Sequence, residues 1–126
     1  IKYQVFEKGI GFFVAVTNNV YLLANAGNRV NAYLIDSSYS PPPSLTPPGK
    51  LIQPQAEIGY VWLNKRWSDG SRLDITLGWG TSSQQTYVGV VQQADATDWY
   101  IQGPTGAVYK LALAGTGTWS IVGNVQ

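Results

Sequence analysis

The chain has 126 residues and a mass of 13.7 kDa, the usual size of one domain, so we expect a single domain over residues 1–126. It contains no cysteine and no histidine, which excludes disulfides, thiolate and imidazole metal ligands and a Ser-His-Asp triad. Its formal net charge is +1 and no Lys/Arg run exceeds two residues, which argues against nucleic acid as a partner.

Charged side chains make up 12% of the chain, about half the usual share, whereas aromatic side chains reach 13%. Few charges with many aromatic, Gly, Ser, Thr, Asn and Gln residues indicate a secreted or surface-displayed β protein, or a subunit that assembles. No apolar stretch approaches the roughly 20 residues of a membrane span. Because the chain begins at Ile1 and shows no leader, we expect a processed or truncated product. The composition leads us to expect an extracellular or surface location.

Alternating apolar and polar residues predict short strands along the chain, and helix-type spacing is nearly absent. The predicted strands cover residues 3–7, 11–17, 20–24, 30–36, 58–62, 73–79, 86–92, 98–101, 107–112 and 118–122. The alternation is clearest at Leu73, Ile75, Leu77 and Trp79. Turn-forming residues separate the strands, at 18–19, 25–28, 68–71, 103–106 and 115–117. About ten short strands predict an all-β fold, a single-domain antiparallel β-sandwich.

One segment, SSYSPPPSLTPPG at residues 37–49, breaks this pattern with five prolines. Proline lacks the N–H that a sheet ladder needs, so this segment is expected to be an extended loop. We interpret it as a rigid crossover between two sheets; the alternative is a proline-rich ligand for an aromatic-lined groove. Residues 50–52 are expected to rejoin the sheet.

The strongest candidate site combines aromatic, amide and small polar residues. A sugar presents apolar C–H faces and a rim of hydroxyls, so a lectin site needs a flat aromatic ring flanked by hydrogen-bonding groups. Asn64, Arg66, Trp67 and Asp69 offer that mixture beside a predicted turn. Trp99 is a further stacking candidate, although on a strand it faces away from Asp98 and Tyr100. Trp79 and Trp119 are instead expected to be core or strand-pair residues.

The acidic residues offer a second interpretation. A glycosidase needs two carboxylates facing each other across a cleft, and Asp95 and Asp98 are close together in the sequence ADATDWY. The same residues are ordinary turn formers, and no other carboxylate is visibly placed to complete a catalytic pair. We therefore expect no catalytic residue, no metal and no cofactor.

Two short stretches resemble the fungal fruit-body lectins. The first stretch is ungapped and contains Gly11, Phe12, Phe13, Val16, Tyr21, Ala24, Asn25 and Gly27. The second stretch contains Lys65, Arg66, Trp67 and Asp69, similar to that family's KRWxD motif. Two departures are plain: the proline-rich segment replaces the family's glycine-rich central segment, and Leu63 stands where the family keeps an asparagine.

The resemblance implies an actinoporin-like β-sandwich that binds galactosyl or N-acetylhexosamine ends of glycans. It implies that Asp69 lines one sugar site and that Ala24 and Asn25 border the other. Leu63 puts one of these two sites in doubt.

From the sequence we expect a non-enzymatic, lectin-like protein that binds glycans or glycoproteins and self-associates to gain avidity. The alternative is a structural subunit of an extracellular filament, fibre or capsid, assembled by β-strand pairing or strand donation. Its candidate edges are the first predicted strand, which a neighbour could accept, and the uncharged residues 86–92.

Overall fold

The computed structural model describes residues 1–36 and 38–124 and shows a mostly β protein, as the sequence predicts. Two short helices, α1 (Ala56–Asn64) and α2 (Leu73–Leu77), and the 3₁₀ turn η1 (Ala26–Asn28) accompany the strands. The strands are β1 (Lys2–Phe6), β2 (Gly9–Val14), β3 (Asn19–Ala24), β4 (Arg29–Leu34), β5 (Gln85–Thr86), β6 (Val91–Gln93), β7 (Asp98–Gln102), β8 (Ala107–Ala112) and β9 (Thr118–Asn124). Among the described residues, no helix is long and apolar enough to cross a membrane.

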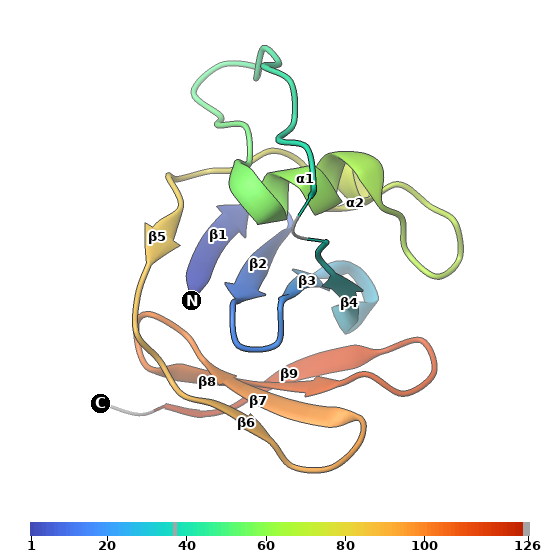
Figure 1. Cartoon of the computed structure of the whole chain (residues 1–126), viewed down its shortest axis with the longest axis vertical. Helices are drawn as coiled ribbons and strands as arrows, with labels where there is room; N and C mark the ends of the chain where they lie inside the picture. The colour runs from blue at the N-terminus through green and yellow to red at the C-terminus, as the bar shows by residue number, and fades with distance from the viewer. Residues whose placement is uncertain (37, 125–126) are drawn as a thin grey trace.

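The nine described strands form one antiparallel sheet in the order β5-β1-β2-β3-β4-β9-β8-β7-β6. Strand β1 lies inside this sheet, between β2 and β5 of its own chain. The connection between β4 and β9 is narrow, because the two strands pair only at Arg29 and Thr118. The sheet bends there, so β1–β4 and β6–β9 form separate layers (Figure 1).

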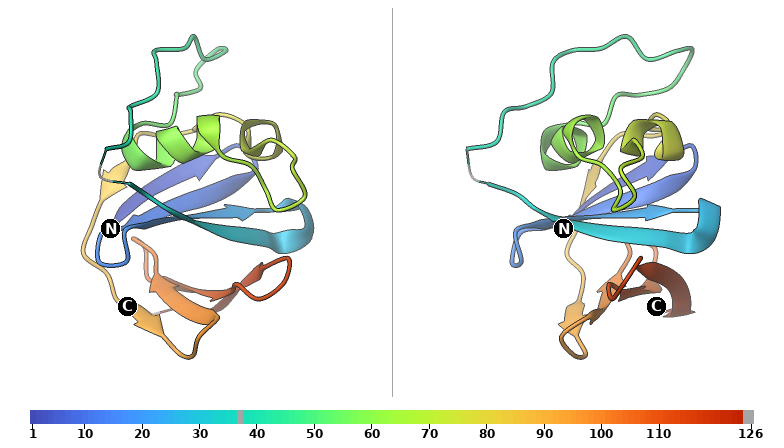
Figure 2. Two further views of the ribbon diagram at one scale, coloured as in Figure 1. Left: turned by 45° about the vertical axis from the view of Figure 1, so that its right-hand side comes forward. Right: turned by 90° about the vertical axis from the view of Figure 1, so that its right-hand side faces the viewer.

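Strands β1–β4 make the middle of three layers. The helices α1 and α2 cover one face of this middle layer, and β6–β9 lie under the other face, as the two further views in Figure 2 also show. Each face of the middle layer therefore has its own core. The five consecutive residues Val20–Ala24 are each no more than 1% exposed, because neighbouring side chains of a strand point into opposite cores.

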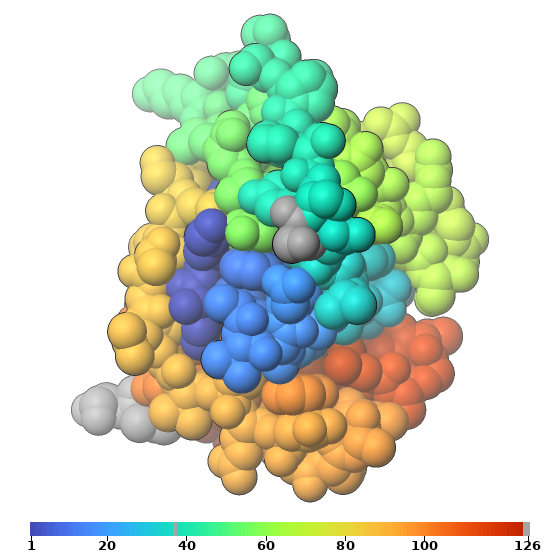
Figure 3. Space-filling model, in the orientation of Figure 1, coloured from blue at the N-terminus to red at the C-terminus, as the bar shows by residue number. Residues whose placement is uncertain are grey.

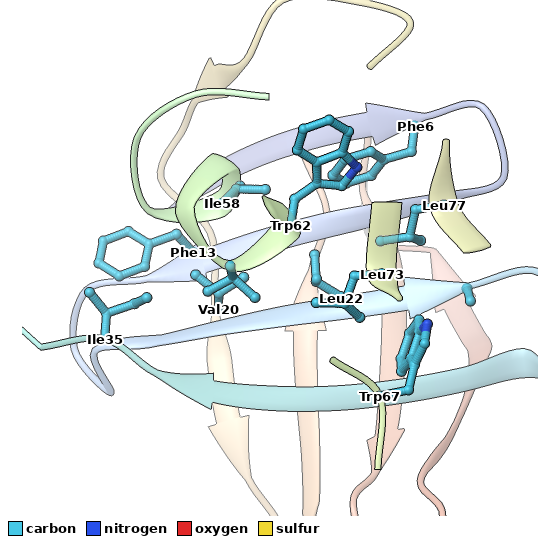
Figure 4. Packing of buried hydrophobic residues seen from close by; sticks show 12 residues of the cluster. Phe6, Phe13, Val20, Leu22, Ile35, Ile58, Trp62, Trp67, Leu73 and Leu77 are labelled. Atoms are coloured by element: carbon cyan, nitrogen blue, oxygen red, sulfur yellow. The ribbon is translucent and has the colours of Figure 1, made fainter. Parts of the chain in front are cut away.

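The first core lies between the middle layer and the helices (Figure 4). Phe13, Val20 and Leu22 of the strands meet Ile58 and Trp62 of α1 and Leu73 and Leu77 of α2. The second core lies between the middle layer and β6–β9. It contains Phe12, Val14, Tyr21, Leu23, Val30, Ile101, Tyr109 and Leu111.

The strand predicted at residues 73–79 is wrong, because α2 occupies most of it. Leu73 and Leu77 are fully buried, whereas Ile75 between them is 66% exposed. Residues at i and i+4 share one face of a helix and also one face of a strand. The alternation therefore fits either a strand or a helix. Packing of Leu73 and Leu77 against the middle layer favours the helix.

The strand predicted at residues 58–62 is also wrong, because these residues belong to α1. Ile58, Val61 and Trp62 are buried at i, i+3 and i+4, the spacing of one helix face. A helix of nine residues is too short to repeat that spacing over a longer window. The indole Nε1 of Trp62 donates to the carbonyl oxygen of Gly78 at 2.8 Å, which ties α1 to the end of α2.

The single strand predicted at residues 86–92 is replaced by two short ones, β5 and β6, with a link over residues 87–90. This link joins the two opposite edges of the sheet. Tyr87 N donates to Ile1 O beside β1, and Gln102 N of β7 donates to Val90 O, each at 2.9 Å. A straight strand cannot pair at both places, so the chain leaves one edge to reach the other.

The proline-rich segment contains neither helix nor strand over residues 38–51; Ser37 lies outside the described residues. It leads from β4 to α1 and not between two sheets, so its predicted role as a sheet-to-sheet crossover is wrong. The buried Gln53 side chain holds it, because Leu45 N donates to Gln53 Oε1 and Gln53 Nε2 donates to Pro43 O, each at 2.8 Å. Beyond it, Ile52 forms one isolated bridge with Gly80, outside the named strands, so residues 50–52 do not form the predicted strand of the sheet.

A test of the α1 packing uses Gly59, where a Cβ would lie 2.3 Å from the carbonyl oxygen of Pro54. Alanine ordinarily stabilises a helix relative to glycine, by about 1 kcal/mol. Here we expect Gly59→Ala to lower the free energy of unfolding by about 1–3 kcal/mol, because the backbone must move. Urea unfolding measures the change. Gly123→Ala, with no atom within 4 Å of the new Cβ, is the control, and equal stability of the two variants would contradict the packing.

Tyrosine burial predicts sensitivity to alkali. Burial raises the pKa of Tyr3 to about 12 and raises that of Tyr87 as well. An unfolded tyrosine releases its proton near pH 10, before the folded one, so the free energy of unfolding falls as pH rises from about 10 through about 12. Urea midpoints measured between pH 8 and 12 test this. Tyr3→Phe is expected to flatten the fall, and an identical fall in that variant would contradict the assignment.

Candidate functional site

Trp67, the predicted stacking residue, lies in the turn between α1 and α2 and is only 4% exposed. The guanidinium carbon of Arg29 lies 4.7 Å from the centre of its ring, and the ring also packs into the first core. Its indole Nε1 is buried without a hydrogen-bond partner among the described residues. A sugar needs an accessible aromatic face, so Trp67 cannot supply the expected stacking without a rearrangement.

Asp69 is exposed, but its carboxylate already has partners. Oδ1 accepts hydrogen bonds from Ser71 N at 2.9 Å and Ser71 Oγ at 2.5 Å. Oδ2 accepts from Arg29 Nη1 at 3.0 Å. The Ser71 hydrogen bonds, with a smaller contribution from Arg29, lower the pKa of the Asp69 carboxyl. These hydrogen bonds give Asp69 a structural role, because they stabilise its turn and connect that turn to β4. A ligand that bound Asp69 would have to compete with Ser71 and Arg29 for the carboxylate.

The other predicted site residues divide into two groups. Asn64, Arg66 and Asn25 are exposed, whereas Ala24 is fully buried. Arg29 follows η1, two residues beyond the first lectin-like stretch, and contacts Trp67 and Asp69 of the second stretch. Within them, Asn64 Nδ2 donates to Tyr60 O and Arg66 Nη1 to Gly70 O.

Trp99 lies apart from that group. It is on β7, packs against the second core and is paired with Leu111 of β8. Strand geometry places Asp98 and Tyr100 on the opposite face, as the sequence predicts. Trp99 therefore does not join Trp67 and Asp69 in one site.

A different surface has the composition that a glycan site needs. We call it the outer face: the side of β6–β9 that points away from the second core. Register and alternation place these residues on it: Gln92, Asp98, Tyr100, Gln102, Val108, Lys110, Ala112, Thr118 and Ser120. Tyr100 of β7 lies directly opposite Lys110 of β8, near the middle of this face.

Two hollows lie on the outer face. The Tyr100 hollow, of about 230 Å³, is lined by Val90, Gln92, Tyr100, Gln102 and Val108. The Trp119 hollow, of about 420 Å³, is lined by Gly27, Asn28, Lys110, Ala112, Thr118, Trp119 and Ser120. The indole Nε1 of Trp119 donates to Ala24 O at 2.9 Å, which fixes the ring beside η1. Tyr100 thus has two amide side chains and two valines beside it, whereas Trp119 lines the other hollow although its ring packs against the second core.

Sequence reasoning missed this surface, although a signal was present. Asp98, Tyr100 and Gln102 alternate with Trp99 and Ile101, so the polar and aromatic residues of this strand share one face. Gln92, Lys110 and Ser120 lie on the same face because of the register between neighbouring strands. The sequence of one strand does not predict that register.

The acidic residues Asp95 and Asp98 have structural partners. Asp95 Oδ1 accepts hydrogen bonds from the backbone N of Thr97 and of Asp98, each at 2.9 Å, and these lower the pKa of Asp95. Asp98 Oδ2 lies 4.0 Å from Lys110 Nζ. A glycosidase acid needs a raised pKa, which these contacts do not provide for Asp95. In the described part of the chain, no group of three or more acidic side chains is placed to hold a metal ion.

Comparison with protein-family models, curated proteins and solved structures found no match for this chain. The resemblance to the fungal fruit-body lectins therefore rests on the residues of the two short stretches alone.

Proposed function

We propose that this protein is a non-enzymatic, lectin-like protein that binds glycans or glycoproteins on the outer face of β6–β9. The observation that carries the proposal is Tyr100, which lines the Tyr100 hollow with Gln92 and Gln102 and lies opposite Lys110 of β8. An aromatic ring offers an apolar surface to the C–H face of a sugar, and the surrounding amides and hydroxyls can replace the water lost from the sugar hydroxyls.

The mechanism is equilibrium capture without bond making or breaking. The side-chain NH₂ of Gln102 can donate to a sugar hydroxyl, because its Oε1 already accepts from Val90 N at 3.1 Å. Lys110 and Ser120 lie opposite each other on β8 and β9 and extend the polar surface toward the Trp119 hollow. Both hollows are open to solvent, and open sites of this kind bind a single glycan weakly. We therefore further propose that the protein forms an oligomer, which gains avidity at an extracellular or cell surface.

Two further observations support the proposal. The second core is enclosed by β1–β4 on one side and β6–β9 on the other, which favours the predicted sandwich. Arg29, two residues beyond the stretch at 11–27, contacts Trp67 and Asp69 of the stretch at 65–69, which offers a second candidate glycan surface beside Asp69.

A glycan array with the labelled protein tests this function. We expect binding that Tyr100→Ala weakens about tenfold or more, because the stacking surface is removed. Tyr100→Phe keeps the ring and is expected to keep most of the binding. Asp69→Asn serves as the site control, because it lies in the other candidate surface. Loss of binding in Asp69→Asn but not in Tyr100→Ala would move the site to the Arg29–Asp69 end, and an array without signal would contradict the glycan proposal.

The alternative function, a self-assembling structural subunit, is favoured by one observation at β9. Residues 120–124 of β9 pair with β8 on one side; because β9 meets β4 only at Thr118, their other side has no strand partner among the described residues. Ile121 and Val122 on this uncharged stretch are 59% and 51% exposed. An uncharged free edge invites pairing with a second copy, although the bulge beside Val108 and Tyr109 limits its length.

Sedimentation at increasing concentration tests this alternative. If β9 pairs with a second copy, Ile121→Lys is expected to reduce association, because a charge on a free edge opposes pairing. Ile75→Lys, a similar change at an exposed site on α2, is expected to have no effect. Equal association of both variants and the unchanged protein would contradict assembly through β9.

A further inference from the structure

A third hollow, of about 410 Å³, lies on a different part of the surface from the two glycan hollows. We call it the Trp99 hollow. It opens between the β2–β3 turn and the link that joins β5 to β6, segments that lie beside each other in Figure 3. Its lining residues are Ile1, Val14, Ala15, Val16, Thr17, Tyr87, Val88, Gly89, Val91 and Trp99.

The walls of this hollow are apolar and partly aromatic. Val14, at 2% exposed, belongs to the second core, and Tyr87, Val91 and Trp99 pack against that core. Val16 and Val88 at the mouth are 96% and 102% exposed. Binding of an apolar molecule would remove part of these two side chains and of the inner wall from water, which is the main source of apolar affinity.

The polar groups of the walls already have partners within the protein. Tyr87 Oη donates to Gln102 O at 2.7 Å, and the amino group of Ile1 donates to Tyr87 O at 2.9 Å. Thr17 Oγ1 lies 3.1 Å from Tyr21 Oη and 3.3 Å from Val14 O. Among the described residues, none of the side chains lining the hollow is charged. The ammonium group of Ile1 is the one charged group among the described lining residues, so a cationic or hydroxyl-rich ligand would lose hydration here with few new partners.

The size of the hollow limits the ligand further. A volume of about 410 Å³ is within the range of small-molecule sites, about 300–1,000 Å³, and well above the roughly 150 Å³ cavity that holds one benzene ring. The Tyr87 and Trp99 rings favour a flat ligand that can pack against them edge-on or stacked. We propose that the Trp99 hollow binds a neutral aromatic molecule of two or three rings, independently of glycan binding on the outer face.

Titration with the neutral fluorescent probe N-phenyl-1-naphthylamine tests this proposal. The expected result is a saturable rise in fluorescence with one site per chain. Val88→Asp and Val16→Asp, both at fully exposed positions and therefore compatible with folding, are expected to weaken binding about tenfold or more, because they bring a charge to the mouth. Ile75→Asp places the same charge at an exposed site on α2 and is the matched control, expected to bind like the unchanged protein.

Location is tested separately by nitrogen–proton correlation spectra of the protein with the same probe. The expected shifts are confined to residues 14–17, 87–91 and the indole N–H of Trp99, and Tyr100→Ala is expected to leave probe binding unchanged. A non-saturable rise in fluorescence, equal affinity of Val88→Asp and the unchanged protein, or shifts centred on other residues would each overturn the proposal. A failed glycan array would not affect it, since the Trp99 hollow shares no lining residue with the Tyr100 hollow or the Trp119 hollow.

Discussion

The burial of both faces of β1–β4 is the constraint on which the rest of this structure depends. Strand β3 has no solvent face over residues 20–24, so its two sets of side chains need two separate covers. The helices α1 and α2 supply one cover and β6–β9 supply the other. A chain of 126 residues thereby gains two cores instead of one, which offsets the lack of disulfides.

Arg29 and Gly117 make the bend between the two parts of the sheet possible. Arg29 begins β4, forms its pairing with β9 and also contacts the Trp67 ring and the Asp69 carboxylate. Gly117 has a φ of +68°, and a Cβ there would lie 2.2 Å from the carbonyl oxygen of Val30. The sheet can turn at this point only because a residue without a side chain allows the two backbones to approach.

The double core also decides which aromatic side chains remain available for binding. Trp62 and Trp67 are buried in the first core, and Trp99 packs against the second core. Tyr100 remains on the outer face because it alternates with Trp99 and Ile101. The Tyr100 hollow and the Trp99 hollow therefore arise from opposite faces of the same strand.

The sequence by itself determined the strand-rich class, the turns and several strand positions, such as 107–112, because these depend on local alternation and on glycine and asparagine chemistry. It also determined that Trp99 and Tyr100 face opposite sides. Only the tertiary structure decided that residues 58–62 and 73–77 are helical, because their apolar spacing suits either a helix or a strand and the uncovered face of β1–β4 selected the helix. It likewise decided that Trp67 is buried and that Gln92, Tyr100 and Lys110 share a surface, because burial and strand register arise from contacts between residues far apart in the chain.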